Sequence, residues 1–122
     1  MNFDIKTEQV REGVHVIALA GEVDLYTAPE FKQQLLEAIS GGARKVVVDF
    51  SETTFIDSTT LGVLVGGVKR LRANDGGELA LVCDDRNITK IFEITGLDRV
   101  FTIYTTRDEA LEAVTSTGQT PA

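Results

Sequence analysis

The sequence predicts a single α/β domain in which a mixed, mostly parallel sheet of four to five strands packs against about four helices. Short apolar runs alternate along the chain with segments of helical periodicity, a pattern typical of strands connected by helices. Three of these runs are almost continuously apolar, as expected for strands covered on both faces. The 122 residues suffice for one hydrophobic core but not for two. The expected order of elements is ββαβαβαβα, with right-handed crossovers.

Five segments carry strand patterns. The first two lie on either side of a tight turn at Glu12-Gly13 and are expected to form a hairpin. The other three are short β-branched or aliphatic runs such as KVVVDF. The predicted strands cover residues 2–10, 13–21, 45–50, 78–83 and 100–104. We expect the domain to span residues 1–114, and the small polar residues 115–122 to form a flexible tail.

Between the strands, apolar residues recur every three or four positions and predict helices. A Thr-x-x-Glu capping box from Thr27 to Glu30 is expected to start the first helix, and a second box, from Thr106 to Glu109, the last. Gly96 follows the third helix at the position where a left-handed residue often ends a helix. The predicted helices cover residues 28–40, 59–73, 86–95 and 107–114.

Composition and charge narrow the classes of function. Lys plus Arg number 12 against 19 Asp plus Glu, a net charge of −7, which disfavours direct binding to nucleic acid or to an anionic membrane surface. With one cysteine, Cys83, and one histidine, His15, the sequence predicts no metal site and no cofactor. No apolar run is long enough to cross a membrane, and the first residues lack the pattern of a secretory signal, so we expect a cytoplasmic protein.

Functional residues are expected at the carboxyl ends of the parallel strands, where sites collect in sheets of this kind. Three loops are predicted to share that edge: Glu22 to Tyr26, Ser51 to Ser58, and Asp84-Asp85. This topology would make Asp24 and Ser58 near neighbours despite their separation in sequence.

The segment FIDSTTLGVLVGG contains the strongest candidate site. Ser58 immediately precedes a helical apolar period and is expected to be the N-cap of that helix. Thr59 and Thr60 add two hydroxyls, more than a cap requires. The helix also contains three glycines, each of which costs about 1 kcal/mol relative to alanine. The face opposite the apolar stripe carries Thr59, Gly62, Val63, Gly66 and Arg70.

Two interpretations of this bare helical face remain open: a close helix–helix contact inside the domain, or a flat landing surface for another protein. A phosphate placed on Ser58 would suit a helix N-terminus and would change the charge of such a surface without unfolding the domain. A small enzyme with Ser58 as nucleophile is disfavoured, because His15 lies too near the start of its strand to act as the base. We interpret His15 and Cys83 as packed residues, and Asp49 as a turn or strand-end residue.

Three stretches carry a resemblance to a known family: GEVDLYTAPEFKQQL, VVVDFSETTFIDSTTLGVLVGGVKRLR and EITGLDRVFTIYTTRDEAL. Together they touch nearly every predicted element. The sequence resembles the STAS domain, the fold of bacterial anti-sigma factor antagonists, and the I-D-S-T segment before the Leu-Gly helix is the most specific part of the match.

The resemblance implies a non-enzymatic partner-switching protein. In the family, the unphosphorylated antagonist binds an anti-sigma factor that is also a serine/threonine kinase and so frees the sigma factor. Phosphorylation of the antagonist weakens that binding, and a metal-dependent serine phosphatase resets the cycle. Carried over by position, Ser58 is the phosphate acceptor. The expected partner-binding residues are Asp24, Asp57, Ser58, Thr59, Gly62, Val63 and Gly66.

The sequence departs from the family pattern at one position. Many members read D-S-x-G-L-G, whereas this chain reads D-S-T-T-L-G, with Thr60 in place of glycine. Thr59 and Thr60 are therefore alternative phosphate acceptors, less favoured than Ser58. A STAS scaffold or accessory subunit of a sensory or lipid-transport assembly is the alternative function.

Overall fold

The computed structural model of the chain describes residues 3–74 and 76–117 and confirms the predicted order of elements. One 3-10 turn, η1, is added to the predicted set. The elements are β1 (Phe3–Arg11), β2 (Val14–Val23), α1 (Ala28–Ser40), β3 (Lys45–Ile56), α2 (Ser58–Ala73), β4 (Glu78–Val82), α3 (Arg86–Thr95), η1 (Leu97–Arg99), β5 (Thr102–Tyr104) and α4 (Arg107–Thr117).

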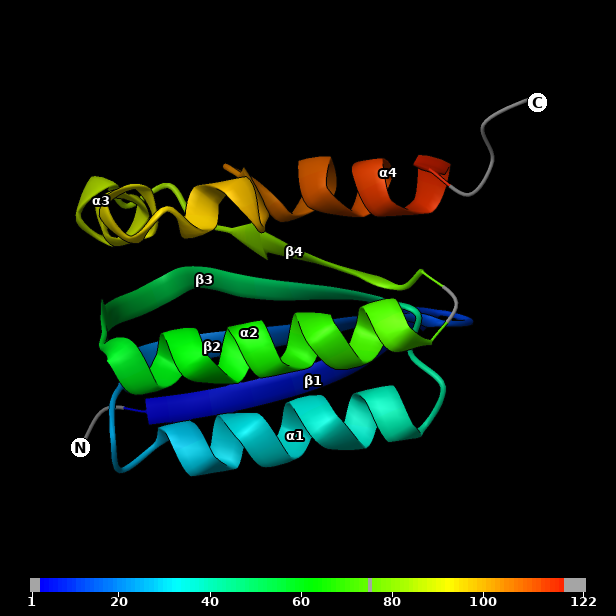
Figure 1. The fold of residues 1–122 in the computed structure, drawn as a ribbon, viewed down its shortest axis with the longest axis horizontal. Helices are drawn as coiled ribbons and strands as arrows, with labels where there is room; N and C mark the ends of the chain where they lie inside the picture. The colour runs from blue at the N-terminus through cyan, green and yellow to red at the C-terminus, as the bar shows by residue number, and fades with distance from the viewer. Residues whose placement is uncertain (1–2, 75, 118–122) are drawn as a thin grey trace.

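The five strands form one sheet in the order β1-β2-β3-β4-β5. β1 pairs with β2 in antiparallel register, and all other neighbours are parallel. The hairpin turn falls at Glu12-Gly13 as predicted, and Gly13 takes the positive φ of 77° that suits glycine. Helices α1 and α2 lie side by side along one face of the sheet, and α4 lies on the other side (Figure 1).

The alternation of side chains along β3 divides the core into two parts. Val46 and Val48 belong to the larger cluster, which α1, α2 and α3 cover, whereas Val47 belongs to a smaller cluster under α4. In the larger cluster Phe92 packs between two other rings, with centroids 6.3 Å from Phe50 and 6.4 Å from Phe101. A sheet covered on both faces explains why β3 and β4 read as continuous apolar runs.

β3 is longer than predicted and continues through residues 51–56, which we expected to form a loop. Thr53 and Ile56 are buried and the other four residues of this extension are exposed. The extension pairs with the end of β2 through two register shifts. The Thr53 hydroxyl donates to the carbonyl oxygen of Leu19 at 2.7 Å. The extension brings the start of α2 to the end of β2.

Asp49 was wrongly interpreted as a turn or strand-end residue. It lies within β3, it is buried, and its carboxylate pairs with Arg107 of α4 at 3.0 Å. The same carboxylate accepts hydrogen bonds from the backbone N–H and the hydroxyl of Ser51. A buried carboxylate is tolerated because a cation and two hydrogen bonds compensate for its lost hydration.

The helix ends agree with the sequence in part. Gly96 ends α3 in the left-handed conformation, and the Thr106 hydroxyl accepts from the N–H of Glu109, both as predicted. The predicted capping box at Thr27 is wrong, because its side chain makes no cap hydrogen bond. Of the tail expected over 115–122, the first three residues end α4, and residues 118–122 lie outside the described residues.

Candidate functional site

The loop between β2 and α1 is held by the carboxylate of Asp24. Its Oδ1 accepts from the backbone N–H of Tyr26 at 2.9 Å and of Thr27 at 3.1 Å, and the Asp24 N–H donates to the Thr27 hydroxyl at 2.9 Å. This Asx turn uses the Thr27 hydroxyl within the loop, which is why that hydroxyl does not cap α1. Asp24 therefore fixes the shape of the loop.

Helix α2 begins with a cap one residue earlier than expected. Asp57, not Ser58, is the N-cap: it is extended, and its Oδ1 accepts from the N–H of Thr59 at 3.0 Å and from the Thr59 hydroxyl. Ser58 is the first residue of the helix. The prediction of Ser58 as the cap was wrong because a carboxylate preceded it and took that position.

The same contacts lower the pKa of Asp57 below its ordinary value of 3.8. The hydrogen bond from the Thr59 hydroxyl is the largest cause, and backbone N–H groups of Thr59, Thr60 and Leu25 act in the same direction, whereas burial opposes them.

We expect Asp57→Ala to lower the free energy of unfolding by about 1 kcal/mol at neutral pH, because it removes the cap. The depressed pKa means that the ionised carboxylate stabilises the folded protein above pH 4, and that this contribution is lost as the pH falls through the folded-state pKa. Urea unfolding at pH 7 and pH 3 would measure both effects. The difference between wild type and variant should shrink at pH 3, and a constant difference would contradict the assignment.

The three adjacent hydroxyls differ sharply in accessibility. The Thr60 side chain is 0% exposed and donates to the carbonyl oxygen of Val23 at 2.8 Å. The Thr59 hydroxyl is occupied by Asp57 and is only partly exposed. Ser58 is exposed at the helix start. Accessibility therefore favours Ser58 over Thr59 and Thr60 as the acceptor.

Contacts between flanking residues bring the segments of Asp24 and Ser58 together, as predicted. Val23 pairs with Ile56 in the sheet, and the Val23 carbonyl accepts a hydrogen bond from the Thr60 hydroxyl. Contrary to the prediction, the Asp84-Asp85 loop does not lie beside these two loops. β4 ends opposite Asp49, whereas β3 continues through residues 50–56, so the third loop is set back along the sheet.

A groove runs between α1 and α2 from the helix starts, with a volume of about 460 Å³. The bare face predicted for α2 lines one side of the groove, and residues of α1 line the other side. The residues that line it are Lys32, Leu35, Leu36, Thr59, Gly62, Val63, Gly66, Gly67 and Arg70.

The glycines separate the two interpretations that the sequence left open. A Cβ on Gly67 would lie 2.5 Å from Cδ2 of Leu35, so this glycine serves the close contact between α1 and α2. A Cβ on Gly62 or Gly66 would meet nothing within 4 Å. The internal contact therefore explains Gly67, whereas Gly62 and Gly66 leave the helix backbone open to the surroundings.

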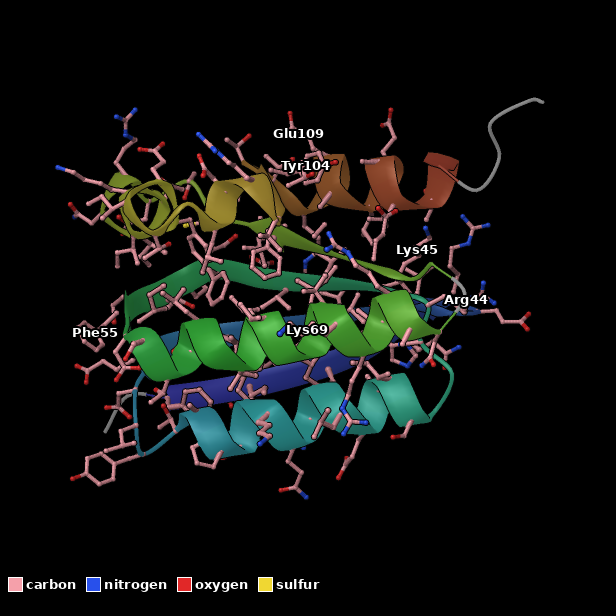
Figure 2. All side chains as sticks on the ribbon, viewed as in Figure 1. Arg44, Lys45, Phe55, Lys69, Tyr104 and Glu109 are labelled. Carbon is pink, nitrogen blue, oxygen red and sulfur yellow. The ribbon has the colours of Figure 1, made fainter. Side chains whose placement is uncertain are left out.

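Sequence reasoning missed the apolar side chains around Ser58. Leu25 and Tyr26 are 61% and 79% exposed in the β2–α1 loop, and Phe55 is 48% exposed near the end of β3. Figure 2 shows Phe55 at the end of the molecule where α2 starts, and Arg44 and Lys45 at the opposite end. The apolar pair Leu25 and Tyr26 in a loop could have been recognised from the sequence as exposed. The exposure of Phe55 could not, because it depends on the unpredicted extension of β3.

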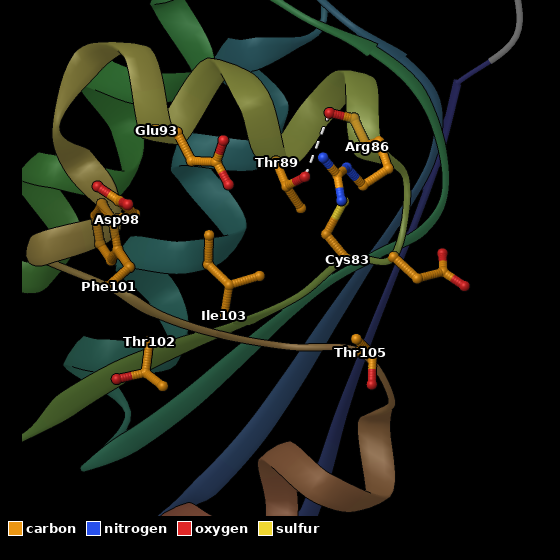
Figure 3. Close-up of a pocket in the computed structure, with 10 residues that line it drawn as sticks. Cys83, Arg86, Thr89, Glu93, Asp98, Phe101, Thr102, Ile103 and Thr105 are labelled. Atoms are coloured by element: carbon orange, nitrogen blue, oxygen red, sulfur yellow. Dashed lines mark hydrogen bonds between the residues drawn. The ribbon is translucent and has the colours of Figure 1, made fainter.

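Cys83 and His15 are packed residues. The Cys83 thiol is buried at the floor of a second pocket, between α3, η1 and β5 (Figure 3), and burial raises its pKa. His15 lies in β2, where its Nδ1 is buried without a hydrogen-bond partner among the described residues.

Residues 3–74 and 76–117 contain no group of three His, Cys, Asp or Glu side chains arranged to hold a metal. None of the helices described there has the length and apolarity of a membrane span.

Comparison with known proteins extends this picture. The STAS domain model matches residues 6–110. An anti-sigma-B factor antagonist of Staphylococcus aureus is 37% identical over 97 residues, which are 80% of this chain and 88% of the relative. The crystal structure of an anti-sigma factor antagonist from Mycobacterium paratuberculosis superposes with a TM-score of 0.84 and 28% identity, covering 93% and 94% of the two chains.

A third comparison concerns phosphorylation. The structure of the Bacillus cell fate determinant SpoIIAA in its phosphorylated form matches with a TM-score of 0.73 and 25% identity, covering 91% of this chain and 99% of that one. The STAS match and the relatives named for antagonism place the chain in a class of small, non-enzymatic binding domains. The chain belongs to the STAS domain family.

Proposed function

We propose that the chain is an anti-sigma factor antagonist that works by partner switching. Its unphosphorylated form binds an anti-sigma factor with serine/threonine kinase activity in the cytoplasm and thereby releases a sigma factor. Phosphorylation of Ser58 weakens that binding, and a metal-dependent serine phosphatase restores it. The names of the relatives support the antagonist role. The exposure of Ser58 at the start of α2, beside the groove, is the observation that carries the proposal.

The geometry explains how a phosphate on Ser58 acts without unfolding the domain. A phosphoserine carries a charge of about −1.5 to −2, and a helix N-terminus with its free N–H groups favours that charge. The backbone below it is held by Asp57 and by the buried Thr60 hydroxyl. The modification therefore changes the charge of the docking surface while the fold beneath it stays in place.

The size of this effect suffices for a switch. Two charges about 4 Å apart interact by roughly 4 kcal/mol at an effective dielectric constant of 20. Half of that repulsion against a carboxylate of the partner corresponds to a loss of affinity of more than about tenfold. Asp24 and Asp57 already make this end of the domain acidic.

Phosphate mapping tests the proposal directly. Purified protein is incubated with ATP and each kinase-type anti-sigma factor encoded in the source genome, and modified sites are located by mass spectrometry. We expect stoichiometric phosphate on Ser58 and none on Ser58→Ala, with Thr59→Val as a matched control that is still modified. Full modification of Ser58→Ala would refute the acceptor assignment. If no kinase modifies or binds the protein, the scaffold function would be favoured instead.

A further inference from the structure

The groove between α1 and α2 has a charge opposite to that of the whole molecule. Its lining contains two cations, Lys32 on α1 and Arg70 on α2, and no carboxylate, although the chain carries a net charge of −7. Both cations are exposed, and neither forms an ion pair with another described residue. Glu37, on the outer surface of α1, accepts a hydrogen bond from the side chain of Gln33.

The floor of the groove is apolar and shallow. Leu36 and Val63 are partly buried there, and the open positions above Gly62 and Gly66 leave bare backbone. Glycines four residues apart on one helix let a second helix approach closely. From Thr59 to Arg70 the groove follows about 16 Å of α2, which corresponds to three helical turns.

We propose that this groove binds an acidic amphipathic helix of the anti-sigma partner. The apolar side of that helix packs on Val63, Leu36 and the glycine backbone, and its carboxylates pair with Lys32 and Arg70. This inference rests on the proposed function and adds to it the chemistry that the partner presents. The complementary charge of the groove in an otherwise acidic protein selects an acidic occupant.

The acidic occupant also accounts for the direction of the switch. Thr59 lines the near end of the groove, and Ser58 directly precedes it at the start of α2. A dianion on Ser58 therefore stands at the entrance of a groove occupied by carboxylates, and the two repel each other. A basic occupant would be attracted by the phosphate, and phosphorylation would then strengthen the complex.

Charge reversal tests the inference with a matched control. The variant Lys32→Glu/Arg70→Glu reverses both groove cations, whereas Lys69→Glu/Lys90→Glu makes the same change in net charge at exposed lysines outside the groove. Affinity is measured by calorimetry for the purified anti-sigma factor that phosphorylates Ser58. We expect at least a tenfold loss for the groove variant and less than a threefold loss for the control. Wild-type affinity should also fall more steeply with salt than that of the groove variant.

A second variant examines the floor independently of charge. Gly62→Leu places an apolar side chain in the groove, and its Cβ would meet nothing within 4 Å. We expect it to weaken binding at least fivefold without lowering the melting temperature. If the wild-type protein binds the anti-sigma factor and is phosphorylated on Ser58, but the groove variants bind it equally well, this inference is wrong. The proposed function would still stand. If the wild-type protein binds no anti-sigma factor, the proposed function fails as well. Tighter binding by Lys32→Glu/Arg70→Glu would show a basic occupant and refute the inference.

Discussion

Ser58→Asp is expected to weaken binding to the anti-sigma factor by about tenfold or more while leaving the melting temperature nearly unchanged. The new carboxylate adds charge where the partner docks, and half of a contact repulsion of roughly 4 kcal/mol corresponds to that loss. At the first position of α2 the same charge is favourable to the helix, by about 0.3–1 kcal/mol. The affinity should therefore fall, while the stability stays the same or rises slightly.

Ser58→Asn provides the control for this experiment, because it is similar in size to aspartate and carries no charge. Calorimetric titration would measure affinity, and differential scanning calorimetry would measure stability. Ser58→Asn should bind within threefold of wild type. A large loss of stability in Ser58→Asp would show that the electrostatics of the helix start differ from those described here.

Gly66→Ala and Gly67→Ala are expected to change stability in opposite directions, although the two residues are adjacent in one helix. A Cβ at Gly66 meets nothing within 4 Å, so alanine should stabilise α2 by about 1 kcal/mol through its higher helix propensity. A Cβ at Gly67 would lie 2.5 Å from Cδ2 of the buried Leu35, and overpacking of this kind costs about 1–3 kcal/mol. The same gain in helix propensity offsets part of this cost, so we expect a net loss of up to about 2 kcal/mol for Gly67→Ala.

Urea unfolding of both variants would measure the difference, which equals the overpacking cost of about 1–3 kcal/mol. Gly62→Ala serves as a second open position and should behave like Gly66→Ala. Equal destabilisation by Gly66→Ala and Gly67→Ala would mean that the whole glycine face is packed inside the domain. That result would remove the physical basis for an open groove.

Much of the fold could be predicted from the sequence because periodicity reports burial directly. The valines of β3 and the apolar residues of α1, including Phe31, Leu35 and Ile39, gave the correct elements. Helix starts were less predictable, because several neighbouring side chains compete for the same N–H groups. Asp57 took the cap position expected for Ser58, and Thr27 formed its hydrogen bonds within the Asp24 turn.

The candidate site was only partly predictable for a different reason. The face of α2 with Gly62, Val63 and Gly66 follows from helical spacing alone, which is local. The opposite wall of the groove, with Lys32 and Leu36, comes from α1, and its position depends on how the two helices pack. The exposure of Phe55 likewise depends on contacts between distant segments. It follows from the pairing of β2 with β3, whose register shifts are not visible in any local sequence pattern.

The hydrogen bond from the buried Thr60 hydroxyl to the Val23 carbonyl has a consequence for the speed of the response. It ties the first turn of α2 to the central sheet, so the proposed cycle of binding and release does not require the start of this helix to move. In that proposed cycle, the delay between signal and release of the sigma factor would be set by the turnover of the proposed kinase and phosphatase. A cell could shorten or lengthen that delay by changing the amounts of these two enzymes alone.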